Sequence, residues 1–407
     1  MKSKKINTPK MRFSEFSEPW APTALGDIAK FSKGKGISKS DINLDGETYC
    51  VRYGELYTTY GTVIDLPVSK TDVPQKDLLL SKGGEVIVPA SGETSEDIAT
   101  ASVVLRAGVA LGGDLNIIES PLDGMFLASY LSEKKKFSLA SMAQGNSVVH
   151  LYYSQIQTLN IGVPTGAEQE KISLFLKAIN EKISLLADEK ATLERYKRGC
   201  AQKIFSQEIR FKDDGGRDFP NWEAKILGDV ATLVNGLTYS PKDIRESGIL
   251  VLRSSNVQDG EIDLEDNVYV DVKIDPDKKT QVGDILLCVR NGSRRLIGKN
   301  AIVRVPLENA THGAFMSVLR GKLNRFLYQL LQTPIFFREV HKNLGATINS
   351  INGSDLREMK FLMPTDHKEM EKISQFLSAI DEKITLAGQE LELAQSFKKG
   401  LLQKMFV

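Results

Sequence analysis

The stretch that decides the fold is PTGAEQEKISLFLKAINEKISLL at residues 164–186, which leads to YKRGCAQKIF at 196–205. The chain contains a second copy, in which PTDHKEMEKISQFLSAIDEKITLA at 364–387 leads to FKKGLLQKMF at 397–406. Between positions 170 and 205, 18 of 36 residues are identical to those 201 positions later. Chance would give roughly two or three identities, so the chain is an internal tandem repeat.

The same spacing of about 200 residues continues outside these segments. Trp20 matches Trp222, and the LGDIA segment at 25–29 matches LGDVA at 227–231. Pro164 matches Pro364. We therefore expect two variable domains, each followed by a helix: a domain at 1–165, a helix at 166–208, a domain at 209–365 and a helix at 366–407.

Apolar residues recur in heptads along both repeated segments, which predicts a coiled coil. Lys190, Lys197 and Lys398 interrupt the second heptad position. The first helix ends where the second variable domain begins, so a paired second helix must run back antiparallel, as a rod of about 57 Å. The predicted coiled-coil core consists of Ile172, Leu176, Ile179, Ile183, Leu186, Leu193, Ile373, Leu377, Ile380, Ile384, Leu391 and Leu401.

The variable domains combine strands with short helices. Short β-branched runs at 84–88 and 283–287 lie between turn residues, and the segments 126–137 and 326–337 have helical patterns at matching places. The predicted fold class is therefore α+β: two mixed α/β domains separated by two long antiparallel coiled-coil helices, as a pseudo-two-fold repeat.

Composition limits the classes of partner. The net charge is +1 with 26% charged residues, so any DNA contact must come from local basic patches. Three cysteines in no CxxC pair fit a reducing cytoplasm and predict neither a disulfide framework nor a zinc site. The absence of a long apolar stretch predicts no membrane span and no signal peptide.

The most basic segment is RNGSRRLIGKNAIVR at 290–304, with five basic residues and no acid. We expect its Asn-Gly turn to project a loop between two strands. Arginine can bind guanine and asparagine can bind adenine at base edges, although an ordinary solvated basic loop would have the same composition. The candidates for DNA contact are Arg290, Asn291, Ser293, Arg294, Arg295 and Lys299.

Three further groups are weaker candidates for DNA contact. The matched segments at 52–60 and 253–256 combine arginine with tyrosine or small polar residues, a lysine cluster surrounds two glycines near residue 35, and polar turns end each domain. Each group also fits an ordinary surface, and the single residues His150 and His312 fit structural roles better. The candidates are Arg52, Tyr53, Tyr57, Tyr60, Arg253, Ser254, Asn256, Lys33, Lys35, Lys39, Asn146, Ser147, Thr347 and Asn349.

Catalytic motifs are missing from the sequence. It contains no Walker A loop, no HExxH, no GxSxG and no Cys/His cluster. It also lacks the tetrapeptide Asp/Asn/Ser-Pro-Pro-Tyr/Phe with which adenine methyltransferases hold a flipped base. We therefore predict a chain that is not itself an enzyme and binds no metal or cofactor.

The ordered motifs resemble the specificity subunit of type I restriction-modification systems over the whole chain. The resemblance rests on the RF…F…W…LGD opening at 12–27, its second copy at 210–229, GDIL at 283–286, GATI at 345–348 and the two EKI…EKI helix starts. It implies that each variable domain reads one half of a bipartite site in double-stranded DNA. It also implies that the first and last segments of the chain pack together.

The resemblance further implies partner subunits on the repeated helices. Two modification (methyltransferase) subunits would use S-adenosylmethionine, and restriction subunits would use ATP and Mg²⁺. Two alternatives stay open: a specificity subunit of a type IIB or IIG-like system, and a coiled-coil adaptor that binds no DNA. A stand-alone enzyme is disfavoured by the missing motifs.

Overall fold

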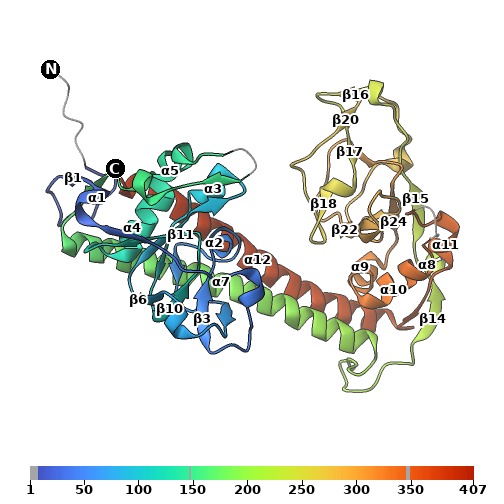
Figure 1. Cartoon of the computed structure of the whole chain (residues 1–407). Helices are drawn as coiled ribbons and strands as arrows, with labels where there is room; N and C mark the ends of the chain where they lie inside the picture. Colours follow the sequence, from blue (N-terminus) through green and yellow to red (C-terminus); the bar gives the residue numbers. More distant parts are fainter. Residues whose placement is uncertain (1–7, 146–147, 345–348) are drawn as a thin grey trace. The chain divides into compact units, whose positions relative to one another are not determined.

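The computed structural model describes residues 8–145, 148–344 and 349–407. They form two compact units, in which Met1–Ala187 joins Gln389–Val407 in unit 1, and Asp188–Gly388 forms unit 2 (Figure 1). The long helices α7 (Gly166–Phe205) and α12 (His367–Met405) each contribute one part to either unit. The prediction of mixed α/β domains with two long helices is confirmed. No helix among the described residues is long and apolar enough for a membrane span.

Unit 1 contains a five-stranded and a four-stranded sheet, with two short strand pairs beside them. The larger sheet has the order β2 (Lys30–Lys33), β11 (Leu115–Glu119), β7 (Val86–Pro89), β9 (Ser102–Val104) and β4 (Val63–Ile64). The smaller has the order β5 (Ser69–Thr71), β3 (Thr48–Val51), β10 (Ala107–Leu111) and β6 (Leu80–Lys82). The pairs are β1 (Ala21–Ala24) with β13 (Asn160–Val163), and β8 (Ser91–Gly92) with β12 (Val149–His150). The short helices are α1 (Leu25–Ile28), α2 (Tyr53–Thr58), α3 (Ser95–Ile98), α4 (Gly124–Ser129), α5 (Lys136–Met142) and α6 (Tyr153–Ile156).

Unit 2 contains two four-stranded sheets and two strand pairs. One sheet has the order β15 (Thr232–Asn235), β24 (Met316–Arg320), β21 (Ile285–Cys288) and β22 (Asn300–Ile302). The other has the order β16 (Ile244–Arg245), β20 (Tyr269–Val270), β17 (Ile249–Leu252) and β23 (Ala310–His312). The pairs are β14 (Glu223–Ile226) with β25 (Lys360–Met363), and β18 (Val257–Gln258) with β19 (Glu261–Ile262). The short helices are α8 (Leu227–Val230), α9 (Asn324–Leu331), α10 (Pro334–Lys342) and α11 (Gly353–Glu358).

The sequence repeat is also a repeat of strand pairing. The antiparallel pair β1 and β13 in unit 1 corresponds to β14 and β25 in unit 2. The antiparallel run β2, β11, β7 corresponds to β15, β24, β21. A parallel pairing also recurs, as β3 with β10 in unit 1 and as β17 with β23 in unit 2, and unit 1 has a second parallel pair in β4 and β9. Each unit therefore builds the same scaffold from a different sequence.

A close crossing of two backbone segments recurs in both units. A Cβ atom on Gly34 would lie 1.7 Å from the carbonyl oxygen of Gly112, and one on Gly236 would lie 2.1 Å from that of Gly313. Any residue with a side chain would clash there, so glycine is required at both places. The crossing fixes the chain just after β2 in unit 1 and just after β15 in unit 2.

An arginine from the opening motif anchors the chain to the start of the long helix in each unit. Arg12 donates to Glu168 of α7 at 2.7 Å through both Nε and Nη2, and Trp20 Nε1 donates to the same carboxylate at 3.2 Å. In unit 2, Arg210 Nη2 lies 2.8 Å from Glu369 of α12. The motif that marks each repeat therefore forms one bidentate ion pair on a buried carboxylate.

The two ends of the chain pack together in unit 1, as expected. The Phe406 ring lies 6.4 Å from that of Trp20 and 5.8 Å from that of Phe126, and Tyr130 Oη donates to the carbonyl of Val407 at 2.5 Å. In unit 2 the end of α7 fills the same position, where Phe205 lies 6.2 Å from Trp222 and 5.6 Å from Phe326. Each unit thus completes its aromatic core with the end of a long helix.

The long helices run antiparallel, as predicted. In unit 2, Lys190 lies opposite Gly388 and Lys197 pairs with Asp381, so positions rise on α7 as they fall on α12. In unit 1 the start of α7 shares a core with the end of α12. Every one of the twelve residues predicted for the coiled-coil core is buried or half-buried.

Lys197, which breaks the heptad pattern, makes a specific set of contacts. Its Nζ lies 2.5 Å from Asp381 Oδ1 and 5.8 Å from the centre of the Tyr328 ring. Asp381 also accepts from Gln329 Nε2 at 2.8 Å. Both charged side chains are only 15% exposed. A charge at one core position therefore selects one register of the two helices and ties them to α9.

We expect Lys197→Ala to lower the free energy of unfolding by about 2 kcal/mol, because it leaves the mostly buried Asp381 with only one hydrogen-bond donor. Lys203→Ala removes an exposed lysine from the same helix and should change it by less than about 0.5 kcal/mol. Denaturant unfolding of the full chain measures both. Equal stabilities of the two variants would contradict the assigned role of Lys197.

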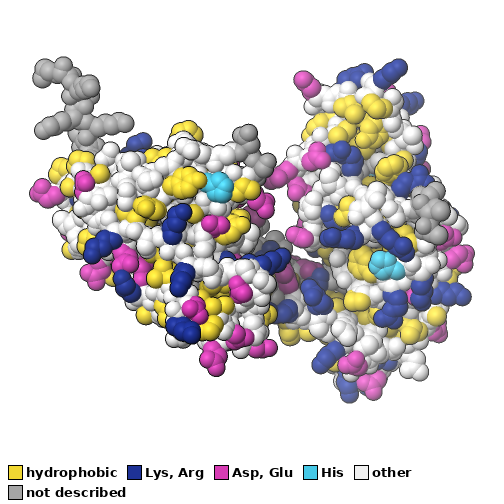
Figure 2. All heavy atoms as spheres, in the orientation of Figure 1, with side chains coloured by type: hydrophobic (Ala, Val, Ile, Leu, Met, Phe, Trp, Pro, Cys, Tyr) yellow, Lys and Arg dark blue, Asp and Glu magenta, His cyan; other side chains and the backbone are white. Residues whose placement is uncertain are grey.

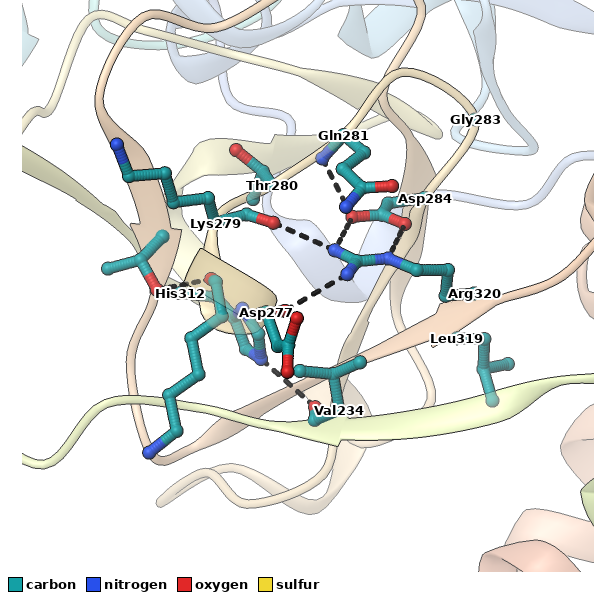
Figure 3. Close-up of polar contacts among 12 residues, drawn as sticks. Val234, Asp277, Lys279, Thr280, Gln281, Gly283, Asp284, His312, Leu319 and Arg320 are labelled. Atoms are coloured by element: carbon teal, nitrogen blue, oxygen red, sulfur yellow. Dashed lines mark hydrogen bonds and ion pairs between the residues drawn. The ribbon is translucent and has the colours of Figure 1, made fainter. Parts of the chain in front are cut away.

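A second ion pair holds the segment before β21 (Figure 3). Arg320 binds Asp284 through two hydrogen bonds of 2.8 and 2.7 Å and donates to the carbonyls of Asp277 and Lys279. Asp284 is 1% exposed and also accepts from the backbone N–H of Gln281 at 2.8 Å. The pair thus fixes the start of β21 on β24.

Unit 1 has a buried carboxylate at the place of Asp284 but no arginine at the place of Arg320. Glu85 is buried and accepts from the backbone N–H groups of Lys82 and Gly83. The strand register puts Glu119 at the place of Arg320, and Glu119 instead pairs with Lys82 at 2.7 Å. Unit 1 therefore binds the buried carboxylate of this turn through backbone N–H groups, whereas unit 2 adds an arginine.

We expect Arg320→Ala to destabilise unit 2 by about 3 kcal/mol, because it leaves Asp284 buried without its cationic partner. Thermal unfolding followed by circular dichroism measures this loss. Arg325→Ala removes an exposed arginine from the same unit and serves as the control. The assignment fails if both variants unfold at the temperature of the unchanged protein.

Candidate nucleic-acid interface

The predicted basic loop lies between the antiparallel strands β21 and β22, as expected, and a short 3-10 turn occupies Arg294–Leu296. Its far end is held by buried contacts, since Asn300 Nδ2 donates to the carbonyls of Gly298 and Leu331. Arg294 and Arg295 are exposed. Within the described residues, neither guanidinium group makes a hydrogen bond or an ion pair. The loop thus presents two unneutralised arginines from a fixed base.

Three segments predicted separately from the sequence meet at this loop. Asn291 Nδ2 donates to Ser254 Oγ at 2.9 Å, and its backbone N–H donates to the carbonyl of Asn349. Asn349 Nδ2 returns a hydrogen bond to the Gly292 carbonyl at 2.9 Å. Asn291 Oδ1 also accepts from the Ser293 N–H. Asn291 and Asn349 therefore position the loop rather than project from it.

Arg290 begins the loop beside an aromatic ring that the sequence reasoning missed. Its guanidinium lies 5.8 Å from the centre of the Phe315 ring, which is 57% exposed. The available signal in the sequence was a phenylalanine directly before the mostly apolar run at 316–320. Together these residues place a cationic and an aromatic group side by side on the surface.

Other predicted cations of unit 2 have partners. Arg253 pairs with Asp266 at 2.7 Å and Arg304 with Glu261 at 2.9 Å. Lys299 donates to Gln258 Oε1 at 3.0 Å. The acidic partners partly neutralise Arg253 and Arg304, so these two contribute less to an anion-binding surface than Arg294 and Arg295 do. Lys299 keeps its full charge, because its partner is a neutral amide.

Asn256 corrects one prediction. It is 1% exposed, its Oδ1 accepts from the Arg253 N–H, and its Nδ2 donates to the carbonyls of Asp263 and Asp266. These bonds use both polar groups of the amide. Asn256 therefore holds the segment 263–266 in place and is not available to a base.

The predicted segment 52–60 of unit 1 is largely engaged in its own contacts. Arg52 lies 3.4 Å from Glu55, and Tyr60 Oη accepts from the Val68 N–H at 2.8 Å. Burial raises the pKa of Tyr60. Burial also raises the pKa of Tyr57, with smaller contributions from Tyr53 and from the carboxylates of Glu93 and Asp97. Nearby carboxylates make this face unfavourable for phosphate.

The lysines of unit 1 are exposed and spread along the chain after β2. Lys33 ends β2 and places its Nζ 5.7 Å from the centre of the Tyr152 ring. Lys35 lies beyond the glycine crossing, and Lys39 begins a 3-10 turn. The predicted residues Asn146, Ser147 and Thr347 lie outside the described residues.

The two single histidines differ in their surroundings. His312 is 1% exposed, its Nε2 lies 3.1 Å from the Val234 carbonyl, and burial lowers its pKa (Figure 3). His150 is exposed and lies against Tyr152. His312 is therefore a core residue of unit 2, whereas His150 lies on the surface of unit 1.

Lysine and arginine side chains are frequent on the face of unit 2 in Figure 2, where acidic side chains lie mainly towards the margin. The face of unit 1 that the figure shows mixes both charges. The net charge of +1 therefore hides a local excess of basic groups.

Comparison with curated proteins finds restriction specificity subunits. The chain is 30% identical over 215 residues to the putative type I restriction enzyme MjaX specificity subunit of Methanocaldococcus jannaschii, covering 50% of this chain and 49% of that protein. It is 23% identical over 193 residues to the type I restriction enzyme EcoKI specificity subunit of Escherichia coli, covering 44% and 41%. The matched part thus spans about half the length of these relatives or less.

Solved structures extend the likeness in fold to nearly the whole chain. The S subunit of a type I restriction-modification system from M. genitalium matches with a TM-score of 0.66 at 16% identity, covering 98% of this chain and 99% of that one. A structure from a study of complex assembly and conformational transition of the type I system matches with a TM-score of 0.55, also at 16% identity, covering 96% and 98%.

The sequence itself matches one family twice. The family is described as "Type I restriction modification DNA specificity domain", and the matches cover residues 17–195 and 220–395. Each match contains one variable domain and most of the long helix that follows it. The chain therefore belongs to the family of type I restriction modification DNA specificity domains.

Proposed function

We propose that this chain is the subunit that gives a type I restriction-modification enzyme its DNA specificity. Each unit reads one half of a bipartite site in double-stranded DNA, and the paired helices bind the other subunits. The observation that carries the proposal is the loop after β21, where two exposed arginines without partners among the described residues project from a hydrogen-bonded base.

The chemistry of this loop suits a base-reading role. An arginine binds O6 and N7 of guanine through two parallel hydrogen bonds, which discriminates against the other bases. The bonds of Asn291 and Asn349 restrict the loop before DNA arrives, so little conformational entropy is lost on binding. Arg294, Arg295 and Arg290 are the readers, while the paired cations nearby serve the phosphate backbone.

Catalysis belongs to partner subunits in this proposal. The sequence has no methyltransferase or nucleoside-triphosphate motif, so S-adenosylmethionine is used by two modification subunits, and ATP with Mg²⁺ by restriction subunits. The chain itself is a non-catalytic reader that uses no cofactor. Its three cysteines are free thiols, which fits action on DNA in the reducing cytoplasm.

Exposed apolar residues at repeat-equivalent positions of the long helices support two equivalent docking faces. Leu185 and Phe397 are 69% and 59% exposed in unit 1, and their equivalents Leu386 and Tyr196 are 59% and 55% exposed in unit 2. Leu393 of unit 1 adds a further 70% exposed side chain. Large apolar side chains that stay exposed on a helix favour a protein partner. One modification subunit on each face gives the expected two.

We expect the full chain to bind duplex DNA with an affinity that falls steeply as salt rises, because phosphate contacts release counterions. Arg294→Ala with Arg295→Ala should weaken binding by about tenfold or more and relax the base preference of one half-site only. Fluorescence anisotropy against salt and selection from random duplexes measure the two effects. Arg325→Ala, which removes an exposed arginine from α9, is the matched control.

Two results would overturn this reading. Binding of wild-type chain that does not depend on salt, or no binding at all, favours the coiled-coil adaptor. If the loop variant relaxes the base preference of both half-sites equally, this loop does not read one half-site.

We expect Leu386→Glu to remove one modification subunit from the assembled complex and Leu185→Glu to remove the other, because a carboxylate cannot be buried in an apolar contact without a partner. Native mass spectrometry of the reconstituted complex counts the subunits. Leu362→Glu places the same charge at an exposed leucine of β25 and should leave two subunits bound. If both helix variants still bind two modification subunits, these faces are not the docking sites.

A further inference from the structure

The edge of unit 2 that carries the basic loop has a counterpart in unit 1. In unit 2 the Ile351 N–H donates to the Val289 carbonyl at 2.9 Å, and in unit 1 the Leu151 N–H donates to the Ala90 carbonyl at 3.0 Å. One residue further along, Arg290 forms an antiparallel bridge with Ser350. In unit 1, Ser91 pairs with His150 in the same antiparallel way.

The comparison shows an exchange of side chains across one bridge. Unit 2 has arginine on the strand side and serine opposite, whereas unit 1 has serine on the strand side and histidine opposite. In each unit the planar nitrogen-bearing group lies beside an aromatic ring. Arg290 lies over Phe315 at 5.8 Å, and the His150 ring stacks with that of Tyr152 at 6.4 Å and 23°.

The group in unit 1 is open to solvent and oriented. Ser91 Oγ lies 3.1 Å from His150 Nδ1, which holds the ring, and no described residue bonds to its Nε2. Tyr152 is 45% exposed, and Lys33 Nζ lies 5.7 Å from the centre of its ring. An ammonium, an imidazole and a phenol are thus presented together from β2, β12 and the chain just beyond β12.

We propose that Lys33, His150 and Tyr152 form the DNA-contacting site of unit 1, equivalent to Arg290 and Phe315 with their loop in unit 2. This inference rests on the proposed function. Lys33 binds a backbone phosphate, His150 Nε2 binds a base edge, and the Tyr152 ring packs against the adjoining sugar and base. The site replaces the segment 52–60, in which Arg52 pairs with Glu55 and Tyr60 Oη accepts from the Val68 N–H. Because the side chains differ from those of unit 2, the two half-sites differ in sequence.

Selection from a pool of random DNA duplexes with the full chain, followed by sequencing, tests the inference. Wild type should enrich two motifs at a constant spacing. His150→Ala with Tyr152→Ala should flatten one motif and lower the affinity for the wild-type sequence about tenfold, as expected for loss of one good base contact. Lys33→Ala should lower the affinity without changing either motif.

The chain offers a matched control in the same unit. Lys70 Nζ lies 5.0 Å from the centre of the Tyr49 ring, so Lys70→Ala removes a comparable lysine over a tyrosine elsewhere. It should leave both motifs and the affinity within about twofold of wild type. An effect as large as that of Lys33→Ala would overturn the site assignment.

The outcomes separate the inference from the function on which it rests. No enriched motif with wild type refutes the proposed function itself. Two motifs with wild type that persist in the His150 and Tyr152 variant refute only the site in unit 1. A variant that loses one motif and keeps the one sensitive to Arg294 and Arg295 is folded and supports the site. Equal loss of both motifs overturns the assignment to unit 1.

Discussion

A buried carboxylate in the first turn of each long helix holds the repeated unit together. Glu168 and Glu369 are each 1% exposed, and each receives an arginine that lies some 160 residues earlier in the chain. A carboxylate so deeply buried needs a charged partner, since an unpaired one would cost several kcal/mol. Its place at a helix N-terminus adds a favourable interaction with the helix dipole. The opening motif, the strands after it and the helix are thereby kept in one arrangement.

Much of this arrangement could be predicted from the sequence, because the chain carries its own comparison. The two copies fix where each long helix begins, and the heptads identify its packed side. Connectivity then leaves only the antiparallel direction, which the pairing of Lys197 with Asp381 bears out. A lysine in a heptad looks like an interruption until its partner on the facing helix is known.

The candidate interface was predicted less completely, for a physical reason. An asparagine that reads a base and one that binds its own backbone have the same side chain, and only burial separates Asn256 from an exposed amide. Tyr152 was missed because its lysine partner is more than a hundred residues away. His150 was set aside as a lone histidine, since the exchange with Ser350 can be seen only after the strands are aligned. Recognition surfaces depend on contacts between distant residues, and helical periodicity does not reveal these.

The two units also differ in the charged residue at the end of one equivalent strand, and this difference limits how the units can recombine. Glu119 stands at the end of β11 where Arg320 stands at the end of β24. A chimaera that moved only that strand into unit 2 would set a glutamate against Asp284, with no cation to separate them. Hybrids that inherit a whole unit keep both members of each ion pair, Arg320 with Asp284 or Lys82 with Glu119. Under the proposed function, new pairings of half-sites therefore arise by shuffling entire units, with crossover points in the helices that both copies share.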